Sequence, residues 1–145
     1  MKIALASDHG GLELKNHLVK FLQENGYETI DFGTNSLESC DYPDYAYKAA
    51  LSIKNGEADL GIVVCTSGIG VSIVANKVQT VRCALVTCVE DAISSKEHNH
   101  ANCLAMGQRR VSKELAEKIV LAWLNTSYGE GRHERRVEKI KALEV

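Results

Sequence analysis

The sequence predicts an α/β protein: a single-domain, three-layer doubly wound sandwich around a five-stranded parallel sheet of order 2-1-3-4-5. Five short apolar runs alternate with segments of helical spacing, which is the pattern of consecutive βαβ units. The 145 residues suffice for one hydrophobic core, and we find no repeat, linker or low-complexity segment. We therefore expect one domain over residues 1–145, ending in a C-terminal helix.

Apolar runs indicate the strands. Ile3, Ala4 and Leu5 follow one another in the first run, which a turn of polar and glycine residues ends. The third run is mostly aliphatic and too short to span a membrane, so we interpret it as a buried strand. In chain order, the expected strands are 2–7, 27–32, 60–65, 81–87 and 103–106.

Helical spacing and cap residues indicate the helices. Leu14, Leu18 and Leu22 share one face of the first helix, and Ser112 can cap the fifth. Residues 98–102 are expected to form a polar loop. In chain order, the expected helices are 12–24, 45–55, a segment ending near residue 75, 90–96, 113–125 and 132–143.

The expected strand order places the first and third strands side by side. Their carboxyl ends then flank the crevice in which open α/β sheets bind ligands. The loops that follow these two strands, 8–11 and 65–70, are both rich in glycine and polar residues. The sequence therefore predicts one functional site between these two loops.

Composition and charge exclude several classes of protein. Seventeen basic and nineteen acidic residues give a net charge of −2, which argues against a nucleic-acid partner for the whole surface. We find no signal peptide and no run of about 20 apolar residues, so we expect a cytoplasmic protein with no membrane partner. Five cysteines without a CxxC pair favour free thiols over a disulfide framework.

Cys65 is the first candidate for chemistry, because it ends the third strand just before a small-residue loop and a helix. A helix N-terminus favours the thiolate form, which can act as a base or as a nucleophile. The glycines of the loop allow N–H groups to converge on a developing oxyanion. A buried structural thiol is the alternative. The loop matches the GxGxxG fingerprint of dinucleotide-binding proteins poorly, because Ile73 stands at the position of the third glycine.

Two histidine-containing loops are further candidates. Asp8 and His9 can bind sugar hydroxyls or a phosphate, although an aspartate after a first strand is often only a turn or cap residue. His98, His100 and Cys103 have a spacing that could supply metal ligands. We expect no metal site, because Cys103 begins a buried strand, and favour a single histidine as proton donor over a solvated loop residue.

The C-terminal arginines indicate an anion. Arg132 and Arg136 lie at i and i+4, where like charges destabilise an isolated helix, and the planar guanidinium group suits phosphate. A solvated basic face is the alternative. Arg109 and Arg110 follow the fifth strand and could also contact an anion. These residues fit a small phosphorylated sugar or polyol, and proton transfer on it requires no cofactor.

Several motifs together resemble ribose-5-phosphate isomerase B, in a family that also includes isomerases of galactose 6-phosphate and allose 6-phosphate. The resemblance covers essentially the whole chain. Its motifs are SDHGG, DFGT, DYPDYA, CTSGIGVSIVANKV, the HN of EHNHAN, and GRHERRV. It implies interconversion of D-ribose 5-phosphate and D-ribulose 5-phosphate through a 1,2-enediolate, in the non-oxidative pentose phosphate pathway, without metal or other cofactor.

The resemblance also implies residue roles. Cys65 matches the base that moves the proton between C1 and C2, Ser67 and the following N–H groups match the enediolate anion hole, and His98 matches the residue that opens the furanose ring. The positions that match substrate contacts are Asp8, His9, Thr66, Gly68, Ile69, Gly70, Asn99, Arg109, Arg132 and Arg136. Relatives usually have glycine in place of Thr66 and an acidic residue in place of His100, so these two positions depart from the family pattern.

The resemblance implies a homodimer or homotetramer in which the neighbouring subunit completes each site. The tail 129–145 would then pack on the partner subunit. Two other functions stay open: an isomerase of a six-carbon sugar phosphate, and a non-catalytic sugar-phosphate sensor. A nucleotide-binding module is the weakest alternative.

Overall fold

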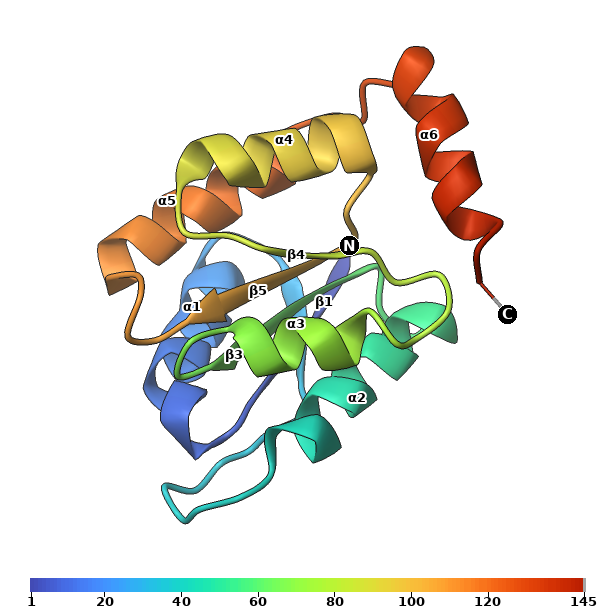
Figure 1. The fold of residues 1–145 in the computed structure, drawn as a ribbon. Helices are drawn as coiled ribbons and strands as arrows, with labels where there is room; N and C mark the ends of the chain where they lie inside the picture. The colour runs from blue at the N-terminus through green and yellow to red at the C-terminus, as the bar shows by residue number, and fades with distance from the viewer. Residues whose placement is uncertain (145) are drawn as a thin grey trace.

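A single parallel sheet forms the centre of the molecule in a computed structural model that describes residues 1–144 (Figure 1). The predicted fold class is confirmed: helices cover both faces of five parallel strands. The strand order is β2-β1-β3-β5-β4. The strands are β1 (Lys2–Ser7), β2 (Glu28–Asp31), β3 (Leu60–Cys65), β4 (Cys83–Leu85) and β5 (Cys103–Gly107).

The predicted order of the last two strands is wrong, because β5 pairs with β3 and β4 lies at the edge. Burial explains the exchange. All five residues of β5 are buried, so this strand needs neighbours on both sides. β4 has three residues, none of them fully buried, and Leu85 is 41% exposed, which suits a short edge strand.

Most helices have the predicted bounds within three residues. α2 begins three residues earlier than predicted because Asp41 takes the N-cap position and Pro43 lies in the first turn, where proline is tolerated. α4 continues to Asn99, so His98 and Asn99 lie in its last turn. The prediction of a loop at these two residues is therefore wrong. The helices are η1 (His9–Gly11, a 3-10 turn), α1 (Leu12–Glu24), α2 (Tyr42–Lys54), α3 (Ile69–Ala75), α4 (Val89–Asn99), α5 (Lys113–Leu124) and α6 (Arg132–Lys141).

The two faces of the sheet have cores of different composition. One face packs against α1 and α5 with large side chains, such as Leu18, Ile119 and Trp123. The other packs against α2 and α3 through a cluster dominated by alanine and valine, with Ala4 and Ala49 fully buried. Small side chains let α2 approach the sheet closely. Cys65 belongs to this second cluster.

α6 stands apart from the sandwich and contacts it beside the end of α4 (Figure 1). The ring of His133 stacks on His98 with centroids 4.5 Å apart, and Tyr128 stacks on His100 at 4.1 Å. Val137 is the one buried residue of α6. Among residues 1–144, no helix is both long and apolar enough to cross a membrane.

Candidate active site

The carboxyl ends of β1 and β3 lie side by side, as predicted, because Ser7 of β1 pairs with Val64 of β3. The loops after the two strands therefore share one edge of the sheet. These two loops and the turn that follows β5 contribute a group of residues that we call the thiol half-site. Its members are Asp8, His9, Cys65, Thr66, Ser67, Gly68, Ile69, Gly70 and Arg109.

Cys65 is held at the end of β3 by its backbone and by its sulfur. Its carbonyl accepts a hydrogen bond from Gln108 N (2.9 Å), and its side chain is buried, with 6% of the residue exposed. The N–H of Gly68 donates to Cys65 Sγ at 3.2 Å. A thiolate accepts such a bond more strongly than a neutral thiol does. The geometry suits a sulfur that exchanges a proton.

The loop after Cys65 needs glycine at position 68. Gly68 has φ +82°, and a Cβ there would lie 2.7 Å from the backbone carbon of Met106. Ser67 Oγ accepts a hydrogen bond from the N–H of Ile69, the first residue of α3 (3.2 Å). Gly68 and Ile69 therefore direct their N–H groups at the sulfur and the hydroxyl that the sequence had marked as catalytic.

Thr66 is exposed and lies opposite Gly10, between the two loops. A Cβ added to Gly10 would collide with Thr66 Oγ1 and would lie 3.4 Å from Asp8 Oδ1. The threonine hydroxyl therefore occupies the space above Gly10, near the Asp8 carboxylate. The N–H of Arg109 donates to Thr66 O at 3.1 Å, which places the start of the Arg109 side chain at this same edge.

Asp8 combines the two roles that the sequence left open. Its Oδ1 accepts a hydrogen bond from Gly11 N (3.1 Å), so it caps η1, and it still lies at the mouth of the site. His9 accepts a hydrogen bond from Cys40 N at Nδ1 (3.2 Å). No role was predicted for Cys40 or Tyr42, yet a Cβ on Gly70 would lie 2.6 Å from the Tyr42 ring. The DYPDYA motif was the available signal for Tyr42.

The remaining predicted residues form a second group, which we call the arginine half-site: His98, Asn99, Arg132 and Arg136. The stacking of His133 on His98 brings the first turn of α6, with Arg132, beside the last turn of α4. All four side chains belong to exposed residues. Partial burial, together with His98 and then Arg132 and Arg136, lowers the pKa of His133. Glu97 opposes this shift, and Arg132 and Arg136 are the groups that suit an anion here.

The two half-sites lie at opposite ends of the sheet within one chain. The residues just after α4 reach the amino end of β3, where Gly61 N donates to Asn102 O (3.0 Å). Cys65 ends the same strand, and four residues of a strand advance about 13 Å. A single chain therefore does not bring His98, Asn99, Arg132 and Arg136 to Cys65.

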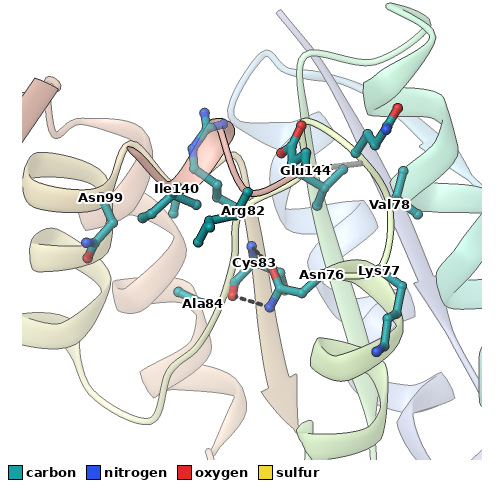
Figure 2. A pocket seen from close by; sticks show the side chains of 13 residues that line it. Asn76, Lys77, Val78, Arg82, Cys83, Ala84, Asn99, Ile140 and Glu144 are labelled. Atoms are coloured by element: carbon teal, nitrogen blue, oxygen red, sulfur yellow. Dashed lines mark hydrogen bonds between the residues drawn. The ribbon is translucent and has the colours of Figure 1, made fainter. Parts of the chain in front are cut away.

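A cavity of about 690 Å³ lies on the side of the arginine half-site, between α6, β4 and the end of α3 (Figure 2). Asn99 stands at one end and Lys77 at the other, with Arg82 and Ile140 between them. Burial lowers the pKa of Arg82. Cys65 does not line this cavity.

The residues with metal-ligand spacing do not converge. His98 and His100 stack on different rings, and Cys103 lies beside Cys83, whose pKa is raised by a hydrogen bond to Cys103 and by burial. Within residues 1–144, no group of three or more His, Cys, Asp or Glu side chains is arranged to hold a metal ion.

Comparison with known proteins places the chain in a family. A family model described as ribose/galactose isomerase matches residues 3–140. Ribose-5-phosphate isomerase B of Escherichia coli K12 is 48% identical over 143 residues, 99% of this chain and 96% of the relative. The structure of ribose-5-phosphate isomerase B from Clostridium thermocellum has a TM-score of 0.98 at 51% identity, covering 99% of this chain and 97% of that one. The Mycoplasma genitalium enzyme, solved with bound ribulose-5-phosphate, has a TM-score of 0.94 at 39% identity, covering 99% and 95%. This chain belongs to the ribose/galactose isomerase family.

Proposed function

We propose that this chain is an aldose–ketose isomerase that interconverts D-ribose 5-phosphate and D-ribulose 5-phosphate. The observation that carries the proposal is the buried Cys65, which accepts an N–H hydrogen bond where the carboxyl ends of β1 and β3 meet. The chain also matches, over 99% of its length, enzymes named ribose-5-phosphate isomerase B. The bound ribulose-5-phosphate of the Mycoplasma genitalium enzyme supports a five-carbon sugar phosphate as the ligand.

In the proposed reaction Cys65 acts as the base. The thiolate removes the proton from C2 of the open-chain aldose, the electron pair forms the C1–C2 double bond, and the carbonyl oxygen becomes the enediolate oxyanion. The thiol then returns the proton to C1. The C2 hydroxyl gives up its proton and becomes the ketone oxygen, and the C1 oxyanion takes up a proton to become the C1 hydroxyl. Gly68 N lies 3.2 Å from the sulfur, and Ser67 and Ile69 directly flank Gly68, so that these groups would stabilise the oxyanion.

We further propose that two copies of the chain share each site. The thiol half-site of one copy would face the arginine half-site of the other, so that Arg132 and Arg136 bind the phosphate and His98 opens the furanose ring. Exposed apolar side chains beside the Cys65 loop support this arrangement, because Ile69 is 50% and Ile73 56% exposed. A two-fold symmetric pair would complete two sites at once.

An isomerase assay with ribose 5-phosphate tests the activity. We expect the wild-type protein to be active and the Cys65→Ala variant to lose activity while it stays folded. Cys88→Ala is the matched control, since it removes a thiol from the N-cap of α4, where the side chain makes no cap hydrogen bond. Equal turnover by Cys65→Ala would refute the mechanism. Higher kcat/KM on allose 6-phosphate would assign the chain to a six-carbon substrate.

We also propose that the enzyme works in the cytoplasm. All five cysteines are free in the structure, and free thiols persist in a reducing compartment. Fractionation of cells that express the chain at its natural level, followed by the isomerase assay on each fraction, tests this location.

A further inference from the structure

The segment 33–41 passes over the end of β1 and contacts the ring of His9. The backbone N–H of Cys40 donates to His9 Nδ1 at 3.2 Å, and Cys40 Sγ lies 3.9 Å from the same nitrogen. A ring nitrogen that accepts an N–H bond presents its lone pair, so a neutral imidazole in this position carries its proton on Nε2. The contact therefore distinguishes the two ring nitrogens of His9.

The beginning of this segment is fixed to β1. Ser7 N donates to Gly33 O and Thr34 N donates to Ser7 O, both at 2.6 Å. Gly33 N also donates to Asp31 Oδ1 at 2.8 Å. Because Ser7 directly precedes Asp8, these bonds fix the segment relative to the loop that carries His9.

An ion pair between a buried lysine and a partly exposed aspartate supports the segment from the side of α1. Lys15 has no exposed surface, and its Nζ donates to both carboxylate oxygens of Asp31 (2.9 and 2.8 Å) and to Asn35 Oδ1 (3.0 Å). All three ammonium protons are thereby bound, which compensates the burial of the charge. The segment is therefore held at Gly33 and Thr34 by bonds to Ser7 and at Asn35 by Lys15 before it reaches Cys40.

We infer that the segment 33–41 holds His9 as the Nε2–H tautomer, so that His9 offers a hydrogen-bond donor to an oxygen atom of the sugar phosphate. This inference rests on the proposed function for the identity of the ligand. Within residues 1–144, Nδ1 is the ring nitrogen of His9 with a hydrogen-bond partner, and Nε2 stays available. Cys40 is a positioning residue that acts through its backbone, not through its thiol.

Nitrogen-15 NMR of protein with labelled histidine tests the tautomer directly at pH 8, without substrate. His9→Gln assigns the signals of His9. In the wild-type protein we expect a protonated Nε2 and an unprotonated Nδ1. A protonated Nδ1 would overturn the inference whether or not the chain is an isomerase, because this readout does not depend on turnover.

Two substitutions at Cys40 separate the backbone from the side chain. Cys40→Pro removes the N–H, whereas Cys40→Ala keeps it and removes the thiol. We expect Cys40→Pro to give a mixture of tautomers and a KM roughly three- to tenfold higher, the loss expected for one neutral hydrogen bond, with kcat changed less. Cys40→Ala should keep the wild-type tautomer and KM. A wild-type spectrum and KM in Cys40→Pro would overturn the inference. If Cys40→Pro does not fold, the spectra of the wild-type protein and of Cys40→Ala still show which ring nitrogen of His9 carries the proton.

Discussion

If two copies share each site, as proposed, two inactive variants should complement each other. One variant, Cys65→Ala, damages the thiol half-site, and the other, Arg132→Ala with Arg136→Ala, damages the arginine half-site. Each variant alone builds two damaged sites per symmetric pair. In a mixed pair, one site combines both damaged halves, while the other combines the intact Cys65 of one chain with the intact arginines of the other.

The expected activity follows from this arrangement. Equal amounts of the two chains, unfolded and refolded together, form mixed pairs in about half of the dimers, and each mixed pair holds one intact site, so about a quarter of the wild-type activity returns. The assay is the initial rate of ribulose 5-phosphate formation per mole of chain. Size-exclusion chromatography of the same sample gives the oligomeric state.

Two controls determine what the result means. Each variant refolded alone must stay inactive, and mixing without unfolding should restore activity only as fast as the subunits exchange. If the refolded mixture is as inactive as the separate variants while it elutes as a dimer, each site is built by one chain and the shared-site proposal is refuted.

Three further substitutions test the packing and the charges described above. Gly10→Ala should lower the free energy of unfolding by about 1 kcal/mol, because the new methyl group collides with the Thr66 hydroxyl. Adding Thr66→Ala to the same chain should restore the lost stability, and urea denaturation measures both variants. Lys15→Met should cost about 1 to 2 kcal/mol by the same measurement, since the hydrogen bonds of Lys15 are lost while water can partly solvate the Asp31 carboxylate, which is 29% exposed. Burial is the main cause, and positively charged neighbours the second, of the lowered pKa values of His100 and His133. As the pH falls below 6.5, these two histidines therefore bind protons in the unfolded chain at a higher pH than in the folded chain. Stability should therefore decrease below pH 6.5, which thermal unfolding from pH 7.5 to 5 measures.

Matched variants give each of these measurements a control. Lys20→Met removes an exposed lysine from the same helix as Lys15 and should cost little; an equal loss would contradict the ion pair of Lys15 as the cause. If Thr66→Ala does not restore the stability that Gly10→Ala loses, the collision with the Thr66 hydroxyl is not the cause of the loss. For the histidines, the double variant His100→Asn, His133→Asn should lose less stability than the wild type between pH 6.5 and 5, and an unchanged pH dependence would contradict their role.

Strong local patterns made part of the fold predictable. β1 and α1 have the predicted bounds, because a run of buried apolar residues and a regular leucine spacing each allow one structure. The end of α4 was not predictable in this way, since its last turn is polar and exposed and has no apolar spacing. The order of β4 and β5 was missed because both are short apolar runs, and complete burial of β5 is a property of the folded chain.

The chemistry of the site was easier to predict than its geometry. The Cys65 loop could be identified because strand, small-residue loop and helix are adjacent in the sequence. Spacing along the chain does not show which end of a sheet a residue reaches, so residues alone could not place His98 and Arg136 at the end opposite Cys65. The role of Cys40 in holding His9 was also hidden, because a backbone N–H has no signature in the sequence.

The unequal cores on the two faces of the sheet bear on how such a sequence can change over time. On the face of α1 and α5, aliphatic side chains can be exchanged for others of similar volume at small cost. On the face of α2, alanines such as Ala4 and Ala49 have only a methyl group to lose, and a larger side chain would push the helix from the sheet. Because Cys65 lies in this second layer, substitutions should accumulate most slowly in the part of the core that supports the thiol.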